Sequence, residues 1–279
     1  SSIVQLDAWN NDDAVVHADD GIHLNWPIAF ARTGWWAERG STEKEESSKR
    51  EKALGNIRSF FLRAKAYAAL PAPERIDLRL EAMRDLFMGE KSLYVHADGA
   101  REIQEAVLFA REMDVRRIVI VGGYDAWRVA DLLRDKKVDV ILKRIHSLPQ
   151  REDEEVDLPY RLPALLKERG IRFCLGYSGD MERMGSRNLG FLAGTASTYG
   201  LSAQDALRAI TLDAAAILGI EKRYGSLETG KSATLFISDG DALDMRTNNV
   251  IAAFIDGRRI SLDDRQKRLW RQYEERYGR

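Results

Sequence analysis

Near its end the chain reads YGSLETGKSATLFISDGDALDMRTNNVIAAFIDGRRI, residues 224–260. Within this stretch, residues 233–238 and 250–255 are apolar runs that contain β-branched and aromatic side chains, and glycines lie on both sides of each run. Runs of this kind between glycines predict short strands joined by tight turns. The stretch therefore predicts a small β unit, and residues 263–277 predict a helix that follows it.

The part of the chain before this β unit alternates strand and helix patterns. The predicted strands cover residues 92–96, 117–121, 138–142 and 171–176, and the predicted helices lie at 101–113, after Asp125, at 162–169 and at 188–199. Strands with few polar residues that are joined by helices predict a parallel sheet with helices on its outer face. Two further helices, at 202–210 and 213–218, lead into the β unit.

The earlier residues have a weaker pattern. They predict a strand at 2–6, a loop at 9–13 and a helix at 54–70 whose apolar residues lie on one side. Residues 43–52 are densely charged, which is typical of a solvated helix face or a mobile insert.

The composition is that of a soluble globular protein. Of the 279 residues, 44% are hydrophobic, which is enough for a core of useful size. The 43 basic residues are interleaved with 44 acidic ones, so no basic face for nucleic acid is expected. No apolar run approaches the length of a membrane span. The single cysteine, Cys174, lies in an apolar run and is predicted to be a core residue, so it leaves the cellular compartment open.

A longer motif in the β unit resembles a family signature. The string Gly-Ser-Leu-Glu-x-Gly-Lys-x-Ala-x-Leu at residues 225–235, followed by Ile-Asp-Gly-Arg at 255–258, resembles the C-terminal hallmark of the amidohydrolase superfamily. The resemblance is closest to the imidazolonepropionase-like branch and covers residues 93–262 well and the earlier part loosely. It implies an α/β fold in which this chain carries the later strands of a TIM-type (β/α)8 barrel and part of a small C-terminal β-sandwich.

The resemblance also implies a division of the chain. Residues 1–219 would form the barrel portion, without the early strands of the barrel, and residues 220–262 would belong to the β-sandwich. Residues 263–279 would be a C-terminal helix.

Two residues at predicted strand ends match positions that bind metal in the superfamily. His96 resembles the histidine of the fifth barrel strand, which is a metal ligand or substrate contact, and Asp180 resembles the aspartate of the eighth strand. The resemblance implies one divalent ion, zinc, held by His96 and Asp180, with Asp180 also taking a proton from the attacking water. Judged by their local sequence alone, His96 fits a histidine bonded to a neighbouring carboxylate equally well, and Asp180 fits a turn former.

The sequence departs from the superfamily pattern between these two residues. The sixth barrel strand usually ends in a histidine, but here the predicted strand runs into Gly122 and Gly123, and no His-x-His occurs in the chain. A zinc site needs about three protein ligands plus water. The remaining ligands would have to come from a segment that this chain does not contain.

Other polar residues near the strand ends are candidates for substrate binding. Lys143 and His146 could hold a substrate carboxylate or carbonyl, or they could point to solvent. Arg187 and Asn188 open a predicted helix and could contact an anionic substrate or cap the helix. His17 and His23 are too far apart for a helical ligand pair and are predicted to be structural.

These observations predict a metal-dependent hydrolase that acts on a cyclic amide or another C–N bond of a small-molecule substrate. The alternative is a catalytically silent amidohydrolase homologue that serves as a binding or assembly module, and the missing sixth-strand histidine favours it. We further expect a partner. The chain begins at Ser1 rather than methionine, and the predicted β unit alone would leave an apolar edge exposed. We therefore expect that the chain is the C-terminal product of a longer precursor and stays bound to a separate N-terminal chain.

Overall fold

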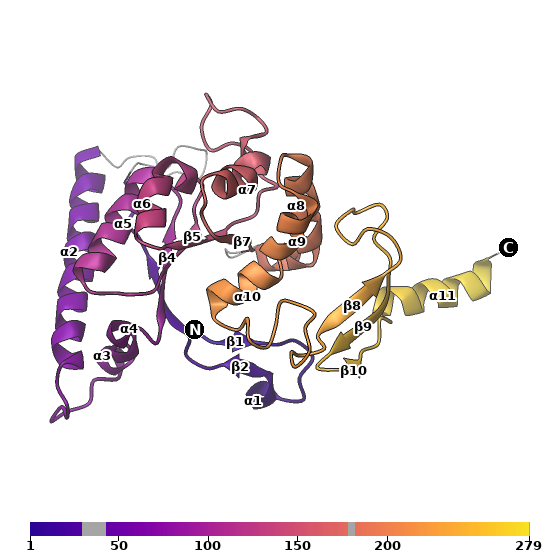
Figure 1. The fold of residues 1–279 in the computed structure, drawn as a ribbon, viewed down its shortest axis with the longest axis horizontal. Helices are drawn as coiled ribbons and strands as arrows, with labels where there is room; N and C mark the ends of the chain where they lie inside the picture. The colour runs from indigo at the N-terminus through magenta and orange to yellow at the C-terminus, as the bar shows by residue number, and fades with distance from the viewer. Residues whose placement is uncertain (30–42, 178–181, 279) are drawn as a thin grey trace.

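Parallel strands form the central sheet of the protein (Figure 1). The computed structural model describes residues 1–29, 43–177 and 182–278. Within these residues the sheet has five strands, in the order β3 (Gly21–Asn25), β4 (Ser92–Ala97), β5 (Ile118–Gly122), β6 (Asp139–Leu142) and β7 (Phe173–Leu175). The order in the sheet is the order in the chain, and each parallel pair is joined by a connection that contains a helix or, between β3 and β4, several helices. In the described residues β3 does not pair with β7, so the sheet is open rather than closed into a barrel.

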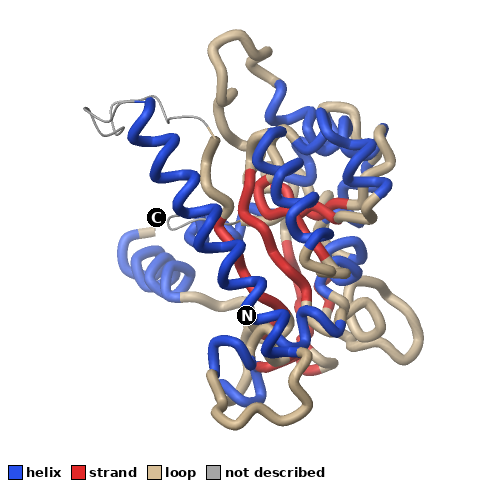
Figure 2. Tube along the Cα trace, turned by 90° about the vertical axis from the view of Figure 1, so that its left-hand side faces the viewer, coloured by secondary structure: helices blue, strands red, loops and turns tan. Residues whose placement is uncertain are grey.

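Helices cover the outer face of the sheet. The long helix α2 (Glu43–Ala68) crosses in front of the strands in Figure 2 and packs on α5 (Ala100–Glu112), where the ring centroids of Phe61 and Phe109 lie 5.2 Å apart. On α5 the buried residues recur three and four positions apart, which places them on the side that faces the sheet. The remaining helical segments of this layer and of the connections are α3 (Leu78–Glu81), α4 (Arg84–Met88), η1 (Ala126–Val129), α6 (Ala130–Asp135), α7 (Leu158–Glu168), η2 (Glu182–Asn188), α8 (Leu189–Thr198) and α9 (Ala203–Ala209).

The inner face of the sheet has a smaller cover. Val121 of β5 and Cys174 of β7 pack there against Ile217 of α10 (Leu212–Leu218). Successive side chains of a strand point to opposite faces, so Tyr94, which belongs to this inner cluster, shares its face with His96 two residues later. The inner face is therefore apolar near α10 and carries histidine toward the C-terminal ends of the strands.

A second sheet follows α10. It is antiparallel and consists, within the described chain, of β8 (Leu235–Ser238), β9 (Val250–Ile255) and β10 (Arg258–Arg259). Helix α11 (Arg265–Tyr277) follows, and the side chain of Asp264 caps it by accepting a hydrogen bond of 2.8 Å from the Lys267 amide. The predicted β unit and the helix after it are thus present, and a second layer that would make the unit a sandwich stays a prediction.

The first residues of the chain lie beside this second sheet (Figure 1). β1 (Ile3–Val4) and β2 (Val15–His17) pair in an antiparallel sheet, with the short helix α1 (Asn11–Ala14) between them. Arg258 links the two regions because its guanidinium donates to the Asp7 carbonyl at 2.9 Å and to the Asp7 carboxylate at 2.8 Å. The N-terminal segment and the second sheet therefore meet, although they are separated by most of the sequence.

The structure corrects several expectations about the early residues. The sequence predicts four strands in the main sheet, but β3 adds a fifth at residues 21–25. The predicted strand at 2–6 is reduced to β1, the predicted loop at 9–13 contains α1, and the predicted helix at 54–70 is part of α2. α2 starts at residue 43 because the charged segment continues the same helix on the solvent side. The sheet is open within the described residues of this chain, which was expected to carry only the later strands of a barrel, and the division of the chain at residues 219 and 262 stays a prediction.

None of the helices in the described ranges combines the length and the apolar character that crossing a bilayer requires.

Candidate functional site

Polar side chains gather where the parallel strands end. β4 ends just before Asp98, and β6 ends just before Lys143. The carboxyl ends of parallel strands meet at the same edge of the sheet, and here the Lys143 ammonium lies 3.0 Å from Asp98 Oδ2. Both side chains are about one third exposed, so the pair is reachable from solvent.

Two histidines face each other on the inner side of this edge. His23 Nδ1 lies 2.9 Å from His96 Nε2, and the two ring centroids are 5.2 Å apart. β3 and β4 bring them together because His23 is in register with Tyr94 and Asn25 is in register with His96. His96 is half-buried and His23 is exposed, so this pair also borders solvent.

Tyr94 packs against His23 of the histidine pair. The His23 ring stacks on the Tyr94 ring, with centroids 4.8 Å apart and an interplanar angle of 17°. The Tyr94 hydroxyl donates to Asp20 Oδ2 at 2.8 Å, and Asp20 also accepts from Ser1 Oγ at 2.7 Å. Burial of Tyr94, together with the neighbouring Asp20 carboxylate, raises the pKa of the phenol, so this hydroxyl remains a donor at neutral pH.

The surroundings of His96 lower its pKa and so favour the neutral imidazole. Burial is the largest cause of a lowered pKa at His96, and the nearby His23 and Lys143 add to it, while Asp98 opposes it. A neutral imidazole keeps a free lone pair on one nitrogen, which is the form that binds a metal ion or accepts a proton.

A pocket of about 170 Å³ opens beside the Asp98–Lys143 pair. Asp98 and Lys143 form one side of it, and the loop between β6 and α7 forms another. The remaining lining residues are Gly122, Tyr124, Leu142, Arg144, Ile145, Ser147, Gln150, Pro159 and Leu162. The lining combines two cations, a carboxylate, hydroxyls and an amide with apolar side chains, and such a lining can orient a small polar molecule.

Gly122 at the end of β5 determines how closely Asp98 approaches. Its backbone has φ +117°, and a Cβ there would overlap Asp98 Oδ1 and lie 3.0 Å from the Ala97 carbonyl oxygen. The carboxylate of Asp98 therefore occupies the space that a side chain at the end of β5 would take. Because Gly122 has no side chain, it supplies no ligand at the position where the family resemblance expects a histidine.

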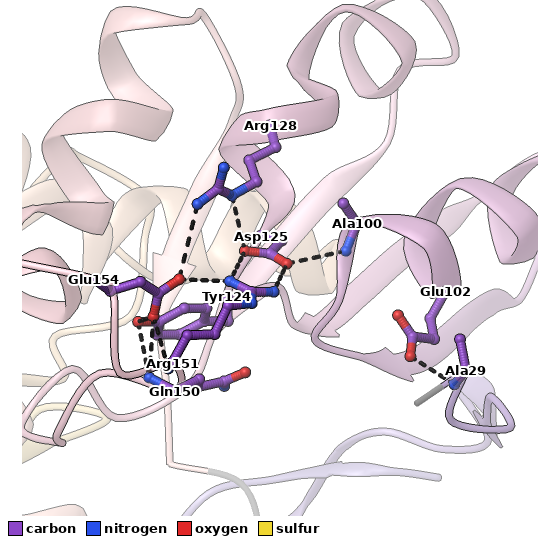
Figure 3. Close-up of polar contacts among 9 residues, drawn as sticks. All are labelled: Ala29, Ala100, Glu102, Tyr124, Asp125, Arg128, Gln150, Arg151 and Glu154. Atoms are coloured by element: carbon purple, nitrogen blue, oxygen red, sulfur yellow. Dashed lines mark hydrogen bonds and ion pairs between the residues drawn. The ribbon is translucent and has the colours of Figure 1, made fainter. Parts of the chain in front are cut away.

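A buried ionic network holds the β6–α7 loop against the neighbouring loops (Figure 3). The Arg151 guanidinium donates to both oxygens of Asp125 and to Glu154. Tyr124 donates its hydroxyl to Glu154 at 2.7 Å, and Arg128 donates to Asp125 at 3.2 Å. Both carboxylate side chains are nearly inaccessible, 3% and 4% exposed, whereas the Arg151 side chain is 42% exposed, so the ion pairs lie at the boundary between the interior and solvent.

This network spans three connections of the sheet. Asp125 follows β5, Arg151 and Glu154 follow β6, and Asp125 Oδ2 also accepts the amide of Ala100 at the start of α5, at 3.3 Å. Proton loss from Tyr124 is opposed by burial and by Glu154, which raise its pKa to about 12. The pocket wall formed by Tyr124 and Gln150 is thus tied to the rigid part of the fold, where Gln150 N donates to Glu154 Oε2 at 3.1 Å.

A second buried carboxylate lies at the start of α5. Glu102 Oε1 accepts the Ala29 amide at 2.7 Å, as Figure 3 shows, and so ties the segment after β3 to α5. Glu102 Oε2 is buried without a hydrogen-bond partner among the described residues. The negative side chain lies in the first turn of α5, where the helix dipole favours it.

The other residues predicted for the site are dispersed. His146 Nε2 lies 2.7 Å from Thr195 Oγ1 and its ring meets Tyr160 edge-on, so it contacts α7 and α8 and is absent from the pocket lining. Arg187 is exposed at the end of η2, and Asn188 precedes α8 without a side-chain capping bond. Asp180 lies outside the described residues. Of the substrate-binding candidates, the structure brings Lys143 to the pocket lining.

The strand ends offer some, but not all, of the donor atoms that the implied zinc ion needs. No group of three or more histidine, cysteine, aspartate or glutamate side chains is arranged to hold a metal within residues 1–29, 43–177 and 182–278. The His23–His96 pair does provide two convergent imidazole nitrogens, which are zinc-type donors. These two donors fit part of a zinc site, and a further donor has to come from elsewhere.

Sequence reasoning missed three residues of this edge. His23 is predicted to be structural because its spacing from His17 does not suit a helical ligand pair. It lies on β3 instead, where the alternation of Ile22 and Leu24 around it is a strand pattern. Asp98 and Arg151 carried no signal, because each lies in a polar loop where charged residues are common. Their roles appear only once the loops are placed side by side.

Comparisons with known proteins agree with this architecture. The amidohydrolase family matches residues 78–260, which is more than half of the chain. An amidohydrolase from Thermotoga maritima MSB8 superimposes with a TM-score of 0.76 at 23% identity, covering 93% of this chain and 67% of its own. A Xaa-Pro dipeptidase with methionine bound in its active site superimposes with a TM-score of 0.55 at 18% identity, covering 87% and 54%.

The chain therefore spans about two thirds of the length of the first of these structures and about half of the second. No curated protein matches the sequence. At these identities the structural likeness shows a shared fold, and the match over residues 78–260 shows the family. The chain belongs to the amidohydrolase family.

Proposed function

We propose that this protein is a metal-dependent hydrolase that acts on a cyclic amide or another C–N bond of a small-molecule substrate, in the manner of the imidazolonepropionase-like branch. The position of His96 carries the proposal. It lies at the carboxyl end of a parallel strand, two residues before Asp98 of the pocket, and within the segment that matches the amidohydrolase family. In barrels of this type, catalytic groups come from the carboxyl ends of the strands.

The proposed roles follow from the chemistry of each side chain. His96 and Asp180 would hold one divalent ion, zinc, which when bound polarises a carbonyl and makes water more acidic. Asp180 takes the proton of the attacking water as general base. Lys143 binds a negatively charged or carbonyl group of the substrate at the pocket, a role supported by its exposure there. His146, Arg187 and Asn188 stay predicted substrate contacts.

The test combines metal analysis with a hydrolysis assay on the purified protein. We expect a stoichiometric divalent metal and turnover of at least one compound in a panel of small cyclic amides. Asp180→Asn should lower turnover by about a hundredfold or more, the usual contribution of a general base. Asp131→Asn, on exposed α6, is the matched control and should keep full activity.

The silent-homologue alternative has one observation in its favour. Gly122 leaves the end of β5 without a side chain where a catalytic member of the family would carry a histidine. Absence of metal from the native protein, together with no turnover across the panel, would support a binding or assembly module instead. In that case the pocket beside Lys143 would still bind small polar ligands without converting them.

We also propose that a separate N-terminal chain from the same precursor binds this protein and supplies further strands. Among the described residues, β3 pairs only with β4 and β7 only with β6, so both edges of the sheet are open. An apolar pocket of about 290 Å³ lies beside β3, and its walls include Ile57, Phe60 and Met83. Open edges and apolar grooves of this kind favour association with another chain.

Native mass spectrometry of the protein from its source tests this association. A complex heavier than this 31.6 kDa chain, from which a second polypeptide of the same precursor is identified, is expected. A lone monomer of 31.6 kDa that unfolds cooperatively would contradict the two-chain proposal.

A further inference from the structure

We propose that the pocket lined by Asp98 and Lys143 binds a small zwitterion, with Asp98 holding the ammonium group of the ligand and Lys143 its carboxylate. Such a ligand carries the two charges of a free amino acid on one carbon atom or on adjacent ones. The inference deepens the proposed function and rests on it for the reaction, because it gives the substrate an amino-acid head and leaves the C–N bond to be hydrolysed in the rest of the molecule.

The two charges of this pair are only partly used inside the protein. Lys143 Nζ lies 3.0 Å from Asp98 Oδ2, and among the described residues neither side chain has another hydrogen-bond or ion-pair partner. An ammonium group can donate three hydrogen bonds, and a carboxylate can accept about four. Each group therefore keeps the capacity to bind a ligand.

A ligand that carries both charges replaces one ion pair with two. The Asp98–Lys143 pair is partly exposed, and ion pairs in such positions contribute little to stability, so this pair opens at small cost. A simple anion would bind Lys143 but lie next to the Asp98 carboxylate, and a simple cation would lie next to the Lys143 ammonium. The pocket therefore selects against ligands that carry a single charge. Arg144 adds a second cation to the lining, so a simple anion is the strongest competitor of a zwitterion.

Asp98 is held in place, so the opening of the pair falls to Lys143. The Asp98 carbonyl oxygen accepts the Asp125 amide at 2.8 Å, and Asp98 Oδ1 occupies the space where a Cβ on Gly122 would lie. The Lys143 ammonium sits on a flexible four-carbon stem that can turn toward a ligand carboxylate. A fixed anion thus determines where the ligand ammonium binds, and a mobile cation adapts to the carboxylate.

The rest of the lining fits a short apolar side chain. The cavity measures about 170 Å³. Its apolar lining residues are Leu142, Ile145, Pro159 and Leu162, and its polar ones include Ser147 and Gln150. Apolar walls with a few polar groups that fix orientation are typical of small-molecule sites. We therefore expect an aliphatic amino acid, or a derivative that keeps both of its charges, to bind here.

Ligands that differ only in charge test the inference on the unaltered protein. L-norvaline carries both charges, pentanoate lacks the ammonium group and butylamine lacks the carboxylate, while all of them share the same propyl chain. Titration calorimetry on the purified protein, with any chain that co-purifies, should show L-norvaline binding about tenfold or more tightly than the other two, because each of those lacks one charge-assisted contact. Equal affinity for pentanoate, or no binding of L-norvaline, would overturn the inference.

Two variants should change the preference in opposite directions. Asp98→Asn should weaken L-norvaline binding about tenfold or more and leave pentanoate bound at least as tightly as before. Lys143→Gln should weaken L-norvaline and pentanoate by about tenfold or more and leave butylamine bound at least as tightly. Asp131→Asn and Lys65→Gln are the matched controls, because each removes one charge of an exposed pair outside the pocket lining. Unchanged affinity of either pocket variant for L-norvaline would contradict the assigned roles, and the ligand series on the unaltered protein decides the question even if a variant fails to fold.

Binding and turnover separate this inference from the proposed function. If L-norvaline is preferred but the protein holds no metal and hydrolyses none of the cyclic amides, the zwitterion site stands and the proposed hydrolase is wrong. If cyclic amides without a charged head are hydrolysed and L-norvaline is not preferred over pentanoate, the proposed function stands and the zwitterion site is wrong.

Discussion

The Arg151 guanidinium pairs with an Asp125 carboxylate that is only 3% exposed, and the pair joins the loop after β6 to the loop after β5. Removing Arg151 would leave two buried carboxylates, Asp125 and Glu154, with fewer compensating charges. Breaking a fully buried pair typically costs about 3–5 kcal/mol. The Arg151 side chain is 42% exposed, so solvent screening reduces the expected cost here to about 1–3 kcal/mol.

We therefore expect Arg151→Met to lower the free energy of unfolding by about that amount and to raise amide exchange across residues 143–157. Arg151→Lys should restore only part of the protection, because an ammonium cannot donate in a fork to both oxygens of Asp125. Hydrogen exchange with mass spectrometry measures both effects.

The control for this variant is Arg58→Met. Arg58 pairs with Glu112 where both side chains are 50% exposed, and such surface pairs contribute about 0–1 kcal/mol. Equal exchange of the β6–α7 loop in Arg58→Met and Arg151→Met would contradict a special role of the network.

Gly122→Ala should be strongly destabilising for two separable reasons. The backbone there has φ +117°, and an added methyl group would overlap Asp98 and crowd the Ala97 carbonyl oxygen. Gly230→Ala isolates the first cause, since Gly230 has φ +91° with open space around its Cβ position. Backbone strain alone costs about 1–3 kcal/mol, and Gly122→Ala should cost more than Gly230→Ala in a urea titration.

A double-mutant cycle identifies the clashing group. Removing the carboxylate with Asp98→Ala should reduce the cost of Gly122→Ala, because the methyl group could then occupy the vacated space. Purely additive changes in the free energy of unfolding would show that Asp98 is not the source of the clash.

The pH dependence of stability should carry a contribution from His146. Burial, and then the charge of Arg144, lowers the pKa of His146 below its ordinary 6.5, so the folded protein favours the neutral ring. Below about pH 6.5 the unfolded chain binds this proton more readily than the folded one. The stabilising contribution is therefore present above that pH and is lost as the pH falls through the lowered pKa.

Urea midpoints at pH 7.5 and 5.5 measure this effect. His146→Gln, which can keep a hydrogen bond to Thr195 but cannot titrate, should show a smaller loss of stability on acidification than the unaltered chain. His17→Gln on β2 serves as the comparison and should behave as the unaltered protein does. A His146→Gln variant with an unchanged pH profile would refute the assignment.

Cys174 should resist modification while the protein is folded. The thiol is 4% exposed on the inner face of the sheet, and burial raises its pKa to about 12. Because the thiolate is the reactive form, a thiol reagent at pH 8 should label no cysteine in the native protein and the single cysteine in denaturant.

The same labelling reports on α10. Ile217 of α10 packs against the cluster that contains Cys174, so Ile217→Ala should raise the labelling rate by loosening this cover. Rapid labelling of the unaltered protein would mean that α10 does not protect the inner face in solution.

Several elements could be predicted from the sequence because their signals are local. The strand that becomes β5 is apolar at each of its first four positions, and the glycines around β8 and β9 mark turns. β3 escaped recognition because it is short and contains two polar residues, His23 and Asn25. It becomes a strand through pairing with β4, which begins some seventy residues later in the chain.

The candidate site also has features that the sequence predicts and others that only the tertiary structure shows. The sequence by itself determined that His96 and Lys143 lie at the ends of strands, because strand ends follow from apolar patterning, and the motif at residues 225–235 indicated the resemblance to amidohydrolases. Only the tertiary structure decided that His23 faces His96 across 73 residues, that Asp98 fills the space beside Gly122, and that Arg151 neutralises a buried Asp125. Such contacts depend on strand register and on burial in a low-dielectric interior, and neither is encoded in the spacing of neighbouring residues.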